Sequence, residues 1–180
     1  EINASFQAGT YRLYKNFSGL PDANYSFNVT VVDWAGSLFT NDTRLVIVDT
    51  TLPLISYGLG SDANGTSLAR NYIHLNVSVD ELNGHNLTAF LFSGATISAS
   101  QNFSVNKTPS SNNVTFLSVS DGYYNVSISV RDLAHNVNTT PTNRSFTVDT
   151  TDPVIAYAAP SDANFSFVNR SWIFLNFSFT

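Results

Sequence analysis

The residue pattern with the clearest chemistry in this chain is the triplet Asn-x-Ser/Thr, which is called a sequon. A sequon marks an Asn side chain that can accept an N-linked glycan. Seventeen of the 21 Asn residues begin such a triplet, whereas the share of Ser and Thr, 41 of 180 residues, would give about five by chance. The candidate acceptors are Asn3, Asn16, Asn24, Asn28, Asn41, Asn64, Asn76, Asn86, Asn102, Asn106, Asn113, Asn125, Asn138, Asn143, Asn164, Asn169 and Asn176. This density predicts a heavily glycosylated protein.

The triplets lie in stretches where polar and apolar residues alternate, as in residues 24–33, which read NYSFNVTVVD. In a strand, residues two apart share a face, so Asn and Ser/Thr point the same way and the residue between them points inward. We therefore expect Val77 and Val126 in the core and the acceptors Asn76 and Asn125 toward water. The competing interpretation is a plain polar face in a protein with few charges, but strands disfavour Asn.

Carboxylates gather near two copies of a Val-Asp-Thr-Thr-x-Pro motif, at Asp49 and Asp62 in the first copy and at Asp149, Asp152 and Asp162 in the second. Carboxylate oxygens are ligands that Ca²⁺ prefers. Leu52 stands in the first copy where Asp152 stands in the second, so a repeated ligand set is missing. The sequence thus predicts no defined metal site, and its Ca²⁺ candidates are Asp149, Asp152 and Asp162.

Other catalytic groups do not form a recognisable set. The three His residues are scattered, there is no Cys, and neither a G-x-S-x-G nor an H-E-x-x-H motif occurs. Asp80 and Glu81 are adjacent, so in a strand they face opposite sides. Asp33 and Asp132 follow strand-like segments and are expected to bond turn backbone. We predict that the chain is not an enzyme and carries no cofactor besides covalent glycans.

The chain repeats itself at domain length. Val48–Asn64 matches Val148–Asn164 at an offset of 100, and Tyr25–Asp33 matches Tyr124–Asp132 at an offset of 99. Residues 51–150 therefore make one complete repeat, residues 1–50 the later part of a preceding repeat, and residues 151–180 the beginning of a following one. The partial repeats belong either to a longer array or to subunits that complete one another by strand exchange.

The complete repeat reads as about seven short strands separated by turn residues, which include Asn83-Gly84, Ser93-Gly94 and Asp121-Gly122. The expected strands are Leu54–Tyr57, Tyr72–Val79, a strand around Leu87–Leu91, Ile97–Val105, Val114–Val119, Tyr124–Val130 and Ser145–Asp149. This pattern predicts an all-β fold of tandem immunoglobulin-like β-sandwiches with about 100 residues per repeat. Tyr25 and Tyr124 stand where such a fold carries a tyrosine corner, and ordinary core tyrosines are the alternative.

The strand-and-turn string from Tyr25 to Ser37, followed by Val48–Pro53, recurs from Tyr124 to Asn136 with Val148–Pro153. It resembles the tandem immunoglobulin-like repeats of bacterial and archaeal cell-surface proteins, such as large adhesins and surface-layer or filament components. His135 replaces the Gly of this pattern, which questions whether that turn needs a positive φ. The resemblance covers the whole chain and implies a repeat class rather than one activity.

The composition of the chain limits its expected partners and its expected relation to a membrane. Charged residues are 12%, the net charge is −5 and no Lys/Arg cluster occurs, so nucleic acid is not an expected partner. No run of 18 apolar residues marks a transmembrane segment and no signal peptide begins the chain. Trp34, Trp172 and Phe174 are candidate interface residues, because exposed aromatic side chains often mark contacts.

These features together predict a structural, extracellular glycoprotein of a prokaryotic and, given abundant sequons without Cys, archaeal cell surface. It would form a filament, a stalk or a surface-layer element whose partners are copies of itself or other surface proteins. The alternative is the repeat stalk of an adhesin whose binding tip lies outside these residues. An accessory domain of a carbohydrate-active enzyme is a third class, but the sequence has no conspicuous aromatic platform.

Overall fold

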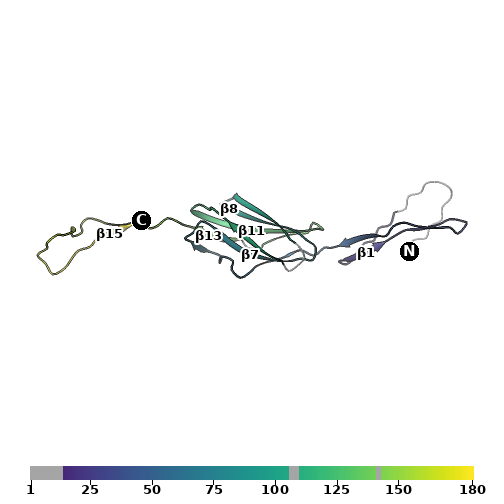
Figure 1. Cartoon of the computed structure of the whole chain (residues 1–180), viewed down its shortest axis with the longest axis horizontal. Coiled ribbons are helices and arrows are strands. Elements are labelled where there is room, and N and C mark those ends of the chain that lie inside the picture. The colour runs from purple at the N-terminus through teal and green to yellow at the C-terminus, as the bar shows by residue number, and fades with distance from the viewer. Residues whose placement is uncertain (1–13, 106–109, 141–142) are drawn as a thin grey trace.

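The computed structural model describes residues 14–105, 110–140 and 143–180. It is an elongated molecule built from strands and loops, with a thick central body and a thinner arm at each end (Figure 1). The central body corresponds to the complete repeat, residues 51–150. The described residues form no helix with the length and hydrophobicity that a membrane crossing requires.

The smaller sheet of the central body has the strand order β10-β7-β5 and is antiparallel. Its strands are β5 (Leu54–Tyr57), β7 (Ile73–Asp80) and β10 (Ser110–Phe116). Side chains along β7 alternate between fully buried, at Ile73, Leu75, Val77 and Val79, and half-buried. The alternation fixes one apolar face, which the sheet turns toward the core as expected.

The larger sheet has the order β6-β13-β11-β8-β9, and β12 also pairs with β11. Its strands are β6 (Thr66–Leu68), β8 (Gly84–Ser93), β9 (Thr96–Ser104), β11 (Gly122–Asp132), β12 (Val137–Thr139) and β13 (Arg144–Val148). Only β6 runs parallel to its neighbour, β13, among the pairs of this sheet. The β8–β9 hairpin closes at the predicted Ser93-Gly94 turn, where Gly94 has φ 60°.

Both sheets contribute to one core. Its fully buried members come from β7, β8, β10, β11 and β13, and the larger ones are Ile73, Leu75, Leu87, Ile128 and Phe146. Apolar faces of two sheets that meet in this way make a β-sandwich, which buries the faces without help from outside the unit.

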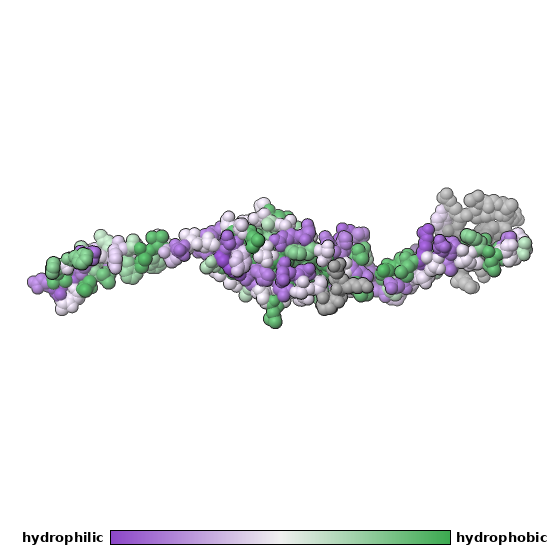
Figure 2. Space-filling model, in the orientation of Figure 1, coloured by the Kyte–Doolittle hydropathy of each residue, from purple (hydrophilic) through white to green (hydrophobic). Residues whose placement is uncertain are grey.

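The two arms carry the same kinds of strand without a partner layer. The N-terminal arm pairs β1 (Ala23–Phe27) with β4 (Arg44–Val48) and β2 (Thr30–Val32) with β3 (Leu38–Thr40), and the C-terminal arm pairs β14 (Ile155–Tyr157) with β15 (Phe177–Phe179). Leu175 is 58% exposed, whereas its counterpart Leu75 is 0% exposed. Both arms accordingly show hydrophobic surface in Figure 2.

All seven expected strands occur in the central body, with three corrections. β6 and β12 were not foreseen, because three-residue strands leave no measurable periodicity. The strand expected at Val114–Val119 ends at Phe116, and Ser118 beyond it has φ 55°. Gly84 is not a turn residue but lies in β8, where a Cβ would stand 2.7 Å from the Val105 side chain.

Two local expectations are also answered, the tyrosine corner at Tyr25 and the positive φ at His135. The Tyr25 hydroxyl donates to the carbonyl oxygen of Pro21 at 2.8 Å, which is the hydrogen bond of a tyrosine corner. The turns after β2 and β11 each use a left-handed residue, Gly36 at φ 85° and His135 at φ 76°. The His in place of Gly therefore does not remove the need for a positive φ.

Candidate functional site

Each junction between repeat units is held by the same clamp. Asp22 Oδ1 accepts from the Thr50 backbone N–H and hydroxyl at 2.9 and 2.8 Å, and its Oδ2 accepts from the Thr51 hydroxyl at 2.7 Å. One repeat later, Asp121 makes the same three bonds to Thr150 and Thr151 at 2.9, 2.7 and 2.7 Å. The Asp-containing turn of one unit therefore fixes the start of the linker that follows it.

The clamps favour the ionised carboxylate. Hydrogen bonds from the hydroxyl of Thr51, then that of Thr50, hold the pKa of Asp22 below its ordinary value. Those from Thr151 and Thr150 lower the pKa of Asp121 in the same way. Both carboxylates are exposed, so solvent screens part of this effect.

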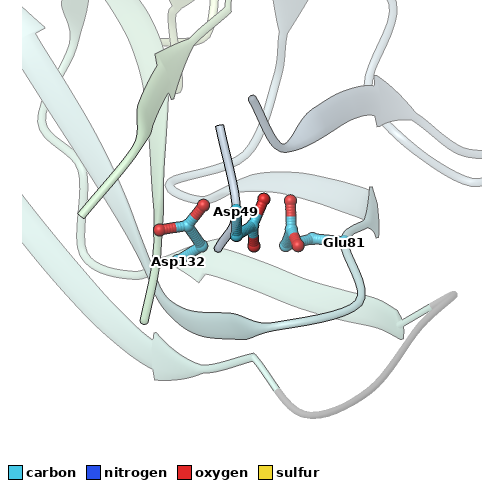
Figure 3. A group of neighbouring side chains, drawn as sticks. All are labelled: Asp49, Glu81 and Asp132. Carbon is cyan, nitrogen blue, oxygen red and sulfur yellow. The ribbon is translucent and has the colours of Figure 1, made fainter. Parts of the chain in front are cut away.

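Three carboxylates from distant parts of the chain meet at the first junction (Figure 3). Asp49 comes from the linker after β4, Glu81 follows β7, and Asp132 ends β11; one carboxylate oxygen of each lies within 4.8 Å of the others. Asp132 is 0% exposed and Glu81 6% exposed. We call Asp49, Glu81 and Asp132 the acidic trio.

Two Asn residues brace the acidic trio. Asn83 donates its backbone N–H to Glu81 at 2.9 Å and its Nδ2 to Asp49 at 2.7 Å. Asn136 donates its backbone N–H to Asp132 at 2.8 Å and its Nδ2 to Asp132 at 2.7 Å and to the Asp49 carbonyl at 3.0 Å. Both belong to the four Asn residues that start no sequon.

No positive side chain pairs with the acidic trio among the residues described. The two ion pairs of the described residues lie outside the trio and join Arg70 with Asp62 and Arg170 with Asp162. Neighbouring carboxylates without a counter-charge repel one another, most strongly where they are buried as Glu81 and Asp132 are. Several carboxylate and amide oxygens close together are a donor set suited to Ca²⁺. The trio is therefore the group of described residues best suited to hold a divalent cation.

The carboxylates singled out from the sequence are not the ones that meet. Asp149, Asp152 and Asp162 form no group of three close ligand atoms, and Asp162 instead pairs with Arg170 and accepts from the Phe174 N–H at 2.7 Å. The Phe174 backbone bond, ahead of Arg170, lowers the pKa of Asp162. The expectation that Asp132 bonds turn backbone is confirmed, but it misses the trio because the three residues are far apart in sequence.

The sequons divide by exposure. Asn3 and Asn106 lie outside the described residues. Ten acceptors are exposed: Asn16, Asn24, Asn28, Asn41, Asn64, Asn102, Asn113, Asn143, Asn164 and Asn169. Five are half-buried: Asn76, Asn86, Asn125, Asn138 and Asn176. The intervening residues Val77 and Val126 are fully buried, as expected from the alternation.

Three half-buried acceptors use their amide nitrogen inside the fold. Asn76 Nδ2 donates to the Leu59 carbonyl at 3.1 Å, and its counterpart Asn176 donates to the Ala159 carbonyl at 3.0 Å. Asn138 Nδ2 donates to the Pro53 carbonyl at 2.7 Å. Because a glycan is attached through this nitrogen, these bonds compete with modification.

The aromatic interface candidates lie on the arms. Trp34 is 90% exposed, Trp172 58% and Phe174 43%. The Trp172 and Phe174 rings meet edge to face with centroids 6.5 Å apart, and the Arg170 guanidinium lies 4.0 Å from the Trp172 ring centroid. Arg70 covers Tyr72 in the same way at 3.9 Å, so this arrangement recurs between repeats.

Comparison with known proteins finds no matching family model and no matching curated protein. Among solved structures, a DUF3823 family protein from Bacteroides ovatus is 15% identical with a TM-score of 0.39, over 71% of this chain and 75% of that one. An engineered protein is 13% identical with a TM-score of 0.42, over 54% of this chain and only 20% of that one. Similarities this low carry no functional argument.

Proposed function

We propose that this chain is a segment of an extracellular, N-glycosylated rod of tandem immunoglobulin-like domains with about 100 residues each. The rod would serve a cell surface as a filament, stalk or surface-layer element. The observation that carries the proposal is the clamp of Asp22 and Asp121, which repeats with the same bonds at both ends of the central body. A joint repeated in this form favours a stiff series of units.

The arms support an array rather than an exchange of strands between copies of this segment. Several of their exposed apolar residues, such as Ile173 and Leu175, occupy positions that are fully buried in the central body, so both arms require further strands. Two copies joined by their arms would supply counterparts of residues 51–80 and 100–150 but none of β8. Since β8 lies between β11 and β9, we propose completion by further strands of the same polypeptide.

Glycans supply the second part of the proposal. The surface has few charges and ten exposed sequon acceptors. Glycans on these acceptors would keep the rod soluble and would cover sheet edges that could pair with other chains. Partners are then further copies or other surface proteins that bind between the glycans.

A divalent cation, Ca²⁺ by its preference for oxygen ligands, is proposed at the acidic trio as a brace of the first junction. The lack of a positive partner among the described residues supports this assignment. It does not depend on the glycans.

Two measurements on native material test the proposed function. A fragment that covers these residues is released from the native protein, and its mass should exceed the 19.6 kDa of the polypeptide by many sugar units. A fragment with the mass of the bare polypeptide would refute the proposed glycosylation. Electron microscopy should show rods that assemble through repeated contacts. A soluble monomeric rod ending in a separate head would instead favour the adhesin stalk.

A further inference from the structure

The outer face of the larger sheet carries a pair of aromatic side chains that do not belong to the hydrophobic core. Phe90 and Phe92 alternate along β8 with the buried Ala89 and Leu91, so their rings lie on the opposite, solvent side of the sheet. The ring centroids are 6.2 Å apart with the planes tilted by 42°. Both side chains are only half-buried.

A sequon runs beside this pair in register. On β11, Asn125 lies opposite Phe92 and Ser127 opposite Phe90. Directly opposed residues of antiparallel strands project to the same face with Cβ atoms about 5 Å apart. The first sugar ring attached to the Asn125 amide can therefore reach the aromatic pair.

Further sequons lie on β8 and β9 beside this half-buried pair. On β9, Ser100 lies opposite Phe90, and Ile97, 54% exposed, lies opposite Phe92. Toward one end of the hairpin, the Thr88 hydroxyl of the Asn86 sequon donates to Asn102 Oδ1 at 2.7 Å. Glycans at these positions would stand in the way of a flat protein partner, so the occupant that the surroundings favour is a sugar.

We propose that the glycan on Asn125 folds back so that its first sugar rings pack on the Phe90–Phe92 pair. A pyranose ring has a face of C–H groups with its hydroxyls at the rim, and an aromatic face carries partial negative charge that attracts those C–H groups. Packing removes apolar area of both from water. The inference rests on the proposed glycosylation and adds a structural role for one glycan.

The test is a double-mutant cycle on the full 180-residue chain. Asn125→Gln removes the acceptor, and Phe90→Thr with Phe92→Thr removes the rings while keeping residues that suit strands. The four proteins are made in a host that adds N-glycans and in one that does not, and site occupancy is measured by mass spectrometry. Asn113→Gln, an exposed sequon on the other sheet, is the matched control.

In the glycosylated series, loss of the Asn125 glycan should lower Tm by roughly 4 °C in the wild type and by much less when the rings are gone. Phe92→Tyr, which keeps the ring, should keep the coupling. The unglycosylated series and Asn113→Gln should show additive effects.

Three results would overturn the inference. Equal Tm losses with and without the rings would show that the glycan does not pack there, although the glycoprotein proposal would stand. An unmodified Asn125 beside occupied sequons would do the same. If the Phe variants instead abolish self-association, the pair contacts a second copy, whereas a chain without any glycan refutes the proposed function itself.

Discussion

At the residue scale, single side chains of this protein hold the linkers on either side of the central body. The Asp121 carboxylate holds both threonines of the linker, Thr150 and Thr151, and the next residue along this linker is the exposed Asp152. The acidic trio adds a second contact at the first junction, built from two buried carboxylates and the half-buried Asp49.

Asp121→Ala should loosen the second junction without unfolding the central body, because it removes three hydrogen bonds at an exposed position. Amide relaxation measured by NMR at Thr150 and Thr151 should show increased motion, with little change in Tm. Asp152→Ala is the control and should leave these amides rigid. Unchanged relaxation in Asp121→Ala would contradict the clamp.

The clamps should also respond to acid in a defined direction. The pKa of Asp22 and of Asp121 is lowered in the folded state, so their contribution is present above the ordinary carboxyl pKa, 3.8, and disappears as pH falls through the lowered value. The same NMR relaxation should therefore stay unchanged down to about pH 4 and rise only in stronger acid. Loosening near neutral pH would argue against these carboxylates as the cause.

Addition of Ca²⁺ to metal-free protein should raise Tm, and a chelator should reverse the shift, because a divalent cation relieves the repulsion within the acidic trio. Glu81→Gln, which removes one of the three charges, should reduce the shift. Asp42→Asn, an exposed carboxylate of the N-terminal arm, should not. A Tm that ignores Ca²⁺ would show that Asn83 and Asn136 alone satisfy the site.

At the element scale, the same strand sequence behaves differently according to what covers it. β7 is packed between its sheet neighbours and the larger sheet, whereas the corresponding segment of the C-terminal arm pairs only through β15 with β14. A substitution at a position of β7 can therefore be compared with the same substitution in the C-terminal arm. The difference between their free energies of unfolding separates the contribution of packing from that of intrinsic strand preference.

Leu75→Ala should lower the free energy of unfolding by roughly 2–5 kcal/mol, since it opens a cavity at a fully buried position. Leu175→Ala, its matched counterpart in the C-terminal arm at 58% exposure, should cost well under 1 kcal/mol. Urea denaturation of the 180-residue chain measures both. Similar losses would mean that the arm is packed against a layer in solution.

At the scale of the whole molecule, the buried apolar residues are concentrated in the central body. The central body buries its own core, and the arms expose theirs (Figure 2). In the proposed array each arm would be half of a domain, so the exposed faces are unfinished cores rather than binding surfaces.

Limited proteolysis of the 180-residue chain should first cut within the arms and leave a fragment near residues 51–150, because cleavage requires local opening and the arms have few packed contacts. Mass spectrometry of the early fragments identifies the cuts. Early cleavage within β7, β8 or β11 of the central body would contradict this distribution of packed contacts.

The sequence alone determined the seven longer strands of the central body, the inward direction of residues such as Val77 and Val126, the repeat and the number of sequons. The strands and the inward direction follow from periodicity over a few residues, which depends only on backbone geometry. Only the tertiary structure decided which distant groups meet: Asp49 with Glu81 and Asp132, Asn138 with the Pro53 carbonyl, and Asn125 with Phe92. Such contacts depend on strand order and register, which many alternating strands of similar composition leave open until the sheets are paired and packed.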